Sequence, residues 1–70
     1  MFLVQWIGWE DWEPKRLFKD QQDAMMWTEN SIPENGSYDH AQLCHFDEQG
    51  EILRCCNYSY EDKSWDNWVR

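Results

Sequence analysis

Two histidines and three cysteines in the C-terminal half are the residues whose chemistry first suggests a metal site. Imidazole and thiolate are the usual ligands of zinc. On extended strands His40 and Cys44 would point the same way but lie roughly 13 Å apart. Cys44 and His45, like Cys55 and Cys56, would point to opposite faces, and no pair has the C-x-x-C spacing of zinc sites. We therefore expect buried core thiols, with no metal ligands and no other cofactor.

A cysteine nucleophile would need a histidine within hydrogen-bond reach. The expected hairpin registers place Gln42 or Leu43, rather than a histidine, opposite Cys55 and Cys56. The sequence contains no glycine-rich phosphate loop, no G-x-S-x-G and no H-E-x-x-H. Acid/base catalysis by paired carboxylates would need a cleft that so short a chain rarely encloses. We expect no catalytic residues and a protein that is not an enzyme.

Acidic residues outnumber basic residues by fourteen to six, and this imbalance coincides with six tryptophans. The formal net charge of −8 opposes direct contact with nucleic acid or with an anionic membrane surface, because both attract clustered lysine and arginine. A basic partner is the natural complement. Tryptophan is among the residues that most often anchor protein interfaces, so the composition indicates binding to another protein.

The acidic residues gather in three segments that we expect to be turns or loops, and tryptophans accompany two of these segments. Side chains in such segments can reach a partner. An exposed tryptophan rimmed by carboxylates would suit a groove lined by arginine and lysine. The predicted partner-binding residues are Glu10, Asp11, Trp12 and Glu13; Asp47, Glu48 and Glu51; and Glu61, Asp62, Trp65, Asp66 and Trp68.

Some of the aromatic residues must instead fill the core, because aliphatic residues are few and residues 1–70 form one small domain. Trp6 and Trp27 are the tryptophans that we assign to the core, together with Phe18 and Phe46. In an edge strand Trp65 and Trp68 would face opposite ways, so one of them should be exposed. The same argument predicts that at least one tryptophan beside the first acidic segment, Trp9 or Trp12, is exposed.

The N-terminal half reads as a strand, a loop and a helix. Residues 2–9 are apolar on both faces, as in a central strand. Residues 10–15 contain three acids and Pro14, which predicts an exposed loop. Asp20 is a good N-cap for a helix of about ten to twelve residues. Its inner face should carry Ala24, Trp27 and either Thr28 or Ile32, its end is marked by Asn30, Ser31 and Pro33, and Asn35-Gly36 should form a turn.

The C-terminal half reads as a hairpin. Asp47 and Gly50 have the spacing of a type I turn followed by a glycine bulge, so residues 38–46 and 51–60 should pair as antiparallel strands. A turn over residues 61–64 would return residues 65–69 as an edge strand, with a loosely packed tail as the alternative. The predicted fold class is α+β: a small antiparallel sheet of three to four strands with one helix on one face, in the order β-α-β-β with or without a fourth C-terminal strand.

The expected location is the cytoplasm. The segment MFLVQWIGWE lacks a basic n-region and a small-residue cleavage site, so it reads as a strand and not as a signal peptide. No apolar run approaches the roughly 20 residues that span a bilayer. Three cysteines, an odd number, argue for reduced thiols and against a disulfide framework.

These observations favour a small acidic inhibitor that occupies the basic surface of a nucleic-acid-binding protein or complex, with carboxylates as phosphate surrogates. In size, acidity and layout the chain resembles the small inhibitors that bacteriophages and mobile elements direct against host nucleases, restriction systems or CRISPR complexes. The alternative is a small subunit or adaptor whose tryptophans complete an oligomeric interface. An enzyme or metalloprotein that uses the Cys and His residues is the third interpretation, and the oligomeric state stays open.

Overall fold

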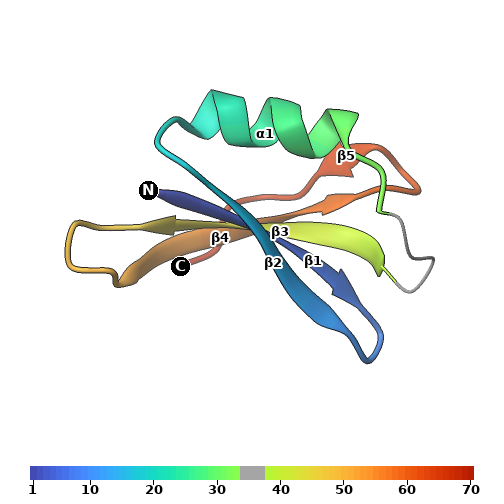
Figure 1. The fold of residues 1–70 in the computed structure, drawn as a ribbon, viewed down its shortest axis with the longest axis horizontal. Helices are drawn as coiled ribbons and strands as arrows, with labels where there is room; N and C mark the ends of the chain where they lie inside the picture. The colour runs from blue at the N-terminus through green and yellow to red at the C-terminus, as the bar shows by residue number, and fades with distance from the viewer. Residues whose placement is uncertain (34–37) are drawn as a thin grey trace.

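The computed structural model describes residues 1–33 and 38–70, which form one antiparallel sheet of five strands with one helix on one face (Figure 1). The α+β class is confirmed, and the sheet has more strands than the three to four predicted. The sheet order is β2-β1-β3-β4-β5. In chain order the elements are β1 (Phe2–Gly8), β2 (Trp12–Phe18), α1 (Gln21–Asn30), β3 (Tyr38–Phe46), β4 (Ile52–Ser59) and β5 (Ser64–Trp65).

The additional strand is β2, and it corrects the prediction of an exposed loop over residues 10–15. β2 pairs antiparallel with β1 and forms one edge of the sheet. The register shifts where Pro14 pairs with Gln5, so the proline lies at an irregularity of an edge strand. There its missing N–H removes no bond that the sheet needs. Proline also favours extended geometry in Glu13, which a strand satisfies as well as a loop.

The β3–β4 hairpin is confirmed, and Asp47 holds its turn. The Asp47 carboxylate accepts hydrogen bonds from the backbone N–H groups of Gln49 and Glu51, each at 2.9 Å. Gly50 donates its N–H to the Asp47 carbonyl at 3.1 Å and has a φ of 84°, which glycine adopts at no steric cost. The predicted turn chemistry is therefore the one that forms.

Helix α1 begins as predicted, with the Asp20 side chain accepting the N–H of Gln22 at 2.8 Å. Ala24 and Thr28 are its buried residues, and the Thr28 hydroxyl donates to the Ala24 carbonyl at 2.8 Å. Thr28, not Ile32, therefore continues the inner face. The predicted Asn35-Gly36 turn lies outside the described residues. No helix in the described parts of the chain is both long and apolar enough to cross a membrane.

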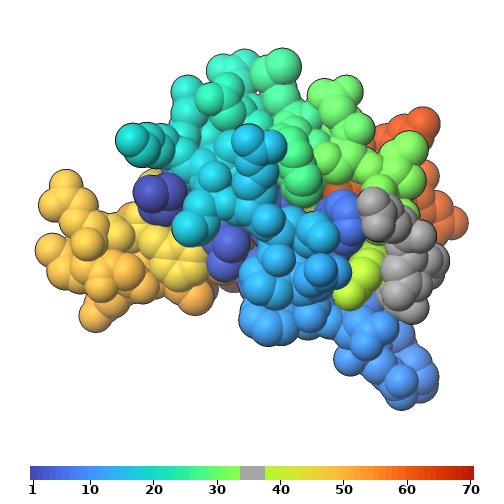
Figure 2. All heavy atoms as spheres, in the orientation of Figure 1, coloured from blue at the N-terminus to red at the C-terminus, as the bar shows by residue number. Residues whose placement is uncertain are grey.

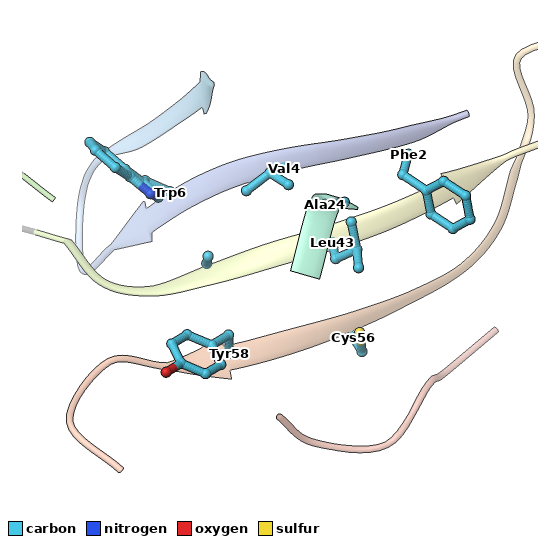
Figure 3. Close-up of a cluster of buried hydrophobic side chains, with 8 residues drawn as sticks. Phe2, Val4, Trp6, Ala24, Leu43, Cys56 and Tyr58 are labelled. Carbon is cyan, nitrogen blue, oxygen red and sulfur yellow. The ribbon is translucent and has the colours of Figure 1, made fainter. Parts of the chain in front are cut away.

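The core lies between α1 and the face of the sheet that the helix covers (Figure 3). Val4 and Leu43, on the adjacent central strands β1 and β3, pair directly and are fully buried. Trp6 is buried as predicted, and the half-buried Trp27 packs 6.3 Å from it between ring centroids. Phe18 packs against the same cluster. The buried cluster comprises Phe2, Val4, Trp6, Ala24, Ala41, Leu43, Cys56 and Tyr58.

The C-terminal segment follows the β4 edge only in part. β5 contains two residues, and beyond it Val69 forms an isolated bridge with Cys55. Trp65 and Trp68 are both half-buried against the core, so the prediction that one of them is exposed is wrong. The physical reason is that residues 66–68 leave the strand, so the alternation of strand faces does not apply to them.

Candidate protein-interaction surface

The turn between β1 and β2 presents aromatic and acidic side chains together. Trp9 is 92% exposed and Trp12 is 60% exposed, so both tryptophans beside the first acidic segment face solvent. Glu10 and Asp11 are exposed between them. A hydrogen bond of 2.8 Å from the Gly8 N–H to the Asp11 carbonyl closes the turn. Figure 2 shows this end of the hairpin projecting from the body of the molecule, so a partner could reach all four side chains.

Glu13 is the last of the predicted partner-binding residues in this segment. Its side chain is half-buried and makes hydrogen bonds within the fold. It accepts hydrogen bonds from the Lys15 ammonium at 3.3 Å and from the Tyr38 hydroxyl at 3.2 Å. Burial and the neighbouring Glu13 carboxylate raise the pKa of Tyr38. The Lys15 ammonium also lies 4.5 Å from the centre of the Trp6 ring. Glu13 therefore ties the edge strand to β3 and the core.

The second predicted segment lies at the tip of the β3–β4 hairpin. Asp47 is used by the turn, whereas the side chains of Glu48 and Glu51 are exposed. The hairpin tip and the β1–β2 turn project from opposite ends of the molecule (Figures 1 and 2). The structure therefore does not bring these two segments together into one surface.

In the third predicted segment, three of the five residues hold the C-terminal tail to the fold. The Asp66 carboxylate accepts the backbone N–H of Asn57 at 2.6 Å. The Trp65 indole N–H donates to Glu29 at 3.0 Å, and the Trp68 ring lies 4.1 Å from the Arg54 guanidinium. The remaining two residues, Glu61 and Asp62, are exposed in the β4–β5 turn.

Beside this turn lies an acidic hollow that sequence reasoning missed. It has a volume of about 410 Å³, and its carboxylates come from Asp39, Glu61, Asp62 and Asp66, with His40 next to Asp39. The sequence signal was weak because Asp39 stands alone in a strand-forming segment. Only the pairing of β3 with β4, which sets His40 opposite Ser59, brings Asp39 to the acids of the β4–β5 turn.

The register also locates the first and third segments relative to each other. β1 runs toward the β1–β2 turn, and Gly8 at its end pairs with Tyr38 at the start of β3. His40 in turn pairs with Ser59 at the end of β4. Both segments therefore lie at the same end of the sheet, on its two opposite edges, because β2 and β5 are the edge strands.

The exposed acids are largely uncompensated. Among residues 1–33 and 38–70 the one ion pair between permanently charged side chains joins Lys15 to Glu13, and a ring nitrogen of His40 lies against the Asp39 carboxylate. Arg54 is engaged elsewhere, since it donates hydrogen bonds to His45 at 3.3 Å and to Gln21 at 3.2 Å. The negative charge of Glu10, Asp11, Glu61 and Asp62 thus faces solvent.

The cysteines and histidines do not converge. Within the described segments no three His, Cys, Asp or Glu side chains are placed to hold a metal ion. Leu43 pairs with Cys56, as one predicted register required, but Cys55 pairs with Cys44 and not with Gln42 or Leu43. Burial raises the pKa of the Cys44 thiol to about 12 and that of Cys56 to about 11.

The comparisons with known proteins returned no family. No protein-family model matches the chain, and neither a curated protein nor a solved structure matches it.

Proposed function

We propose that this protein is a non-enzymatic inhibitor that binds the basic surface of a nucleic-acid-handling protein or complex. The observation that carries the proposal is the β1–β2 turn, where Trp9 and Trp12 are 92% and 60% exposed on either side of two exposed acids, Glu10 and Asp11. Exposing two tryptophans to water is costly unless a partner covers them. The adjacent carboxylates indicate that this partner surface is positively charged.

The mode of action follows from the charge distribution. The net charge of −8 would draw the protein toward a cationic surface and accelerate encounter. Once bound, the tryptophans would fill apolar clefts or stack on arginine, and the carboxylates would take positions that phosphates occupy in the nucleic-acid complex. Nucleic acid and inhibitor would then compete for one surface. We place this activity in the cytoplasm of a host cell, as an anti-defence protein of a phage or mobile element, anti-CRISPR-like in profile.

Several of the residues predicted to bind a partner instead make contacts within the fold. Glu13, Asp47 and Asp66 accept intramolecular hydrogen bonds, and Trp65 and Trp68 are half-buried. The contact surface that we propose is Trp9, Glu10, Asp11 and Trp12, with Glu61 and Asp62 at the other edge of the same end.

Affinity capture from a nuclease-treated bacterial lysate at low salt tests the proposal. The captured proteins should include a nuclease, restriction or CRISPR component, and double-stranded DNA should displace that component from the immobilised chain. Capture that yields no nucleic-acid-handling protein, or a partner that DNA leaves bound, would overturn the proposal.

A matched pair of double variants separates local contacts from overall charge. Glu10→Lys with Asp11→Lys changes the net charge from −8 to −4, and so does Glu48→Lys with Glu51→Lys at the opposite end. The first pair should weaken binding to the captured partner at least tenfold. The second should weaken it far less. Equal losses would show that general charge, and not the β1–β2 turn, drives binding.

The second candidate is a subunit or adaptor that uses its exposed tryptophans in an oligomeric interface. The specific observation in its favour is that β2 is an edge strand with Trp12 and Leu17 both exposed. Its affinity should change little between low and high salt, because the contact would be apolar. Affinity for the basic partner should instead fall steeply with salt.

A further inference from the structure

Two of the three cysteines face each other across the β3–β4 hairpin. Cys44 and Cys55 are direct partners in the register, and their sulfur atoms lie 2.8 Å apart. This distance is shorter than an ordinary contact between two sulfur atoms, and a covalent disulfide of about 2.05 Å would need only a small further approach. Both residues are free cysteines.

The backbone pattern identifies the kind of strand pair that these residues occupy. Cys55 exchanges both backbone hydrogen bonds with Val69, each at 2.8 Å, so its N–H and C=O point away from β3. Cys44 and Cys55 are therefore a non-hydrogen-bonded pair of the β3–β4 ladder. In such pairs the Cα atoms are about 4.5 Å apart and the side chains approach most closely, within the range that a disulfide accepts.

The third cysteine is excluded from this pair by strand alternation. Cys56 belongs to the core cluster on the helix-covered face and is 1% exposed. Cys44 and Cys55 consequently lie on the other face of the sheet. The two faces make the pairing selective, although Cys55 and Cys56 are neighbours in sequence.

We propose that Cys44 and Cys55 form a redox-active dithiol that exchanges with small-molecule disulfides of the glutathione class and closes into a cross-strand disulfide. The site is separate from the proposed interaction surface and does not depend on it. A reversible pair of this kind is compatible with the reduced thiols expected in a cytoplasmic protein, where disulfides are usually transient.

The exchange proceeds in two balanced steps. The Cys55 thiolate attacks one sulfur of the small disulfide, the S–S bond of that molecule breaks, and one small thiolate leaves. Cys44 then loses its proton and attacks the Cys55 sulfur, which forms the intramolecular bond and expels the second small thiolate. The small thiolates take up the two protons. The protein has lost two electrons, and the small disulfide has been reduced to two thiols.

Exposure sets the order of these steps. Cys55 is half-buried and can be reached by an oxidant, whereas Cys44 is 2% exposed. Burial raises the pKa of Cys44, so its thiol is protonated at neutral pH and is a poor first nucleophile. The Gln5 amide, 3.9 Å from the Cys44 sulfur, is the donor best placed to stabilise its thiolate in the second step.

The test uses the folded, reduced 70-residue chain incubated with oxidised glutathione. The sample is quenched in acid, alkylated in denaturant and weighed by mass spectrometry. The number of free thiols should fall from three to one, with Cys56 as the remaining thiol, and dithiothreitol should restore all three. Trypsin cleaves after Arg54, so the disulfide should join two separate peptides, whose fragmentation distinguishes Cys55 from Cys56.

Two variants sharpen the result. Cys55→Ser should form no intramolecular disulfide, whereas Cys56→Ala, the matched control, should still form it. If the Cys56→Ala variant does not fold, the peptide map of the unsubstituted chain shows whether Cys55 or Cys56 is bonded to Cys44. The proposal is overturned if three thiols persist under conditions that oxidise a reference dithiol. It is equally overturned if the bond involves Cys56, or if the reaction stops at a mixed disulfide on Cys55.

Discussion

At the scale of single residues, His45 is a half-buried titratable group that packs against the sheet. Its ring stacks on Phe2, with centroids 4.3 Å apart, and its Nδ1 accepts a hydrogen bond from Arg54 Nε at 3.3 Å. Burial lowers the pKa of His45, and the adjacent Arg54 and the N-terminal ammonium lower it further. Protonation would remove the acceptor and set a second positive charge against the guanidinium.

This arrangement predicts a loss of stability in mild acid. Because the folded state has the lower pKa, the unfolded chain binds the proton more readily. The contribution of His45 is therefore complete above about pH 6.5 and is lost as the pH falls below that value. The free energy of unfolding, measured with urea between about pH 7.5 and pH 5.5, should decrease. His45→Gln should flatten the curve, and identical curves for the two proteins would contradict the role of His45.

The roles of the acids show which parts of the site the sequence could reveal. Asp20 and Asp47 follow local rules of helix caps and turns, because their partners lie within four residues, and both roles were predictable. Glu13 bonds Tyr38, 25 residues away, and Asp66 bonds Asn57 of β4, nine residues away. No local sequence pattern predicts such distant hydrogen-bond partners. The sequence alone therefore cannot distinguish the exposed acids from the acids that accept long-range hydrogen bonds, because the strand pairing decides which acids have partners.

At the scale of elements, the sequence likewise predicts the elements that carry local signals and misses the strand that depends on pairing. The β3–β4 hairpin and α1 carry their own turn and cap signals, and both were predicted with nearly correct bounds. β2 was missed because Pro14 and adjacent charges are depleted in strands in general. An edge strand tolerates both, because one side of its backbone needs no partner and charges there discourage pairing with other chains. Residues 12–18 form a strand because they pair with β1, and no local sequence pattern predicts that pairing.

Helix α1 offers an element-scale test. It has ten residues, so its own propensity gives little stability, and it depends on its cap and on contacts with the sheet. Asp20→Ala removes the acceptor for the Gln22 N–H and should lower the free energy of unfolding by about 1 kcal/mol. Asp20→Ser keeps a capping oxygen and should lose much less. Equal losses in urea unfolding would show that the charge of Asp20, and not its hydrogen bond, stabilises the helix.

At the scale of the whole molecule, the fold carries a net charge of −8 within principal-axis extents of 34 × 23 × 20 Å. Such dimensions are a few times the Debye length of about 10 Å at 0.1 M salt, so neighbouring acids repel while opposite ends are nearly independent. In the described parts of the chain, Glu13 is the one acid that pairs with a lysine or arginine. Self-repulsion therefore works against the folded state.

Added salt should consequently stabilise the free protein. The urea midpoint should rise when KCl is increased from about 20 mM to about 300 mM, because the Debye length falls below the spacing of the surface acids. Both double-lysine variants, at residues 10 and 11 and at residues 48 and 51, should have higher midpoints in low salt and a weaker response to KCl. Stability should thus respond alike to either pair, whereas partner binding should respond mainly to the first. A midpoint that falls with KCl would show that favourable charge interactions outweigh the repulsion. A midpoint that responds to one pair alone would place the repulsion in a local cluster instead of in the overall charge.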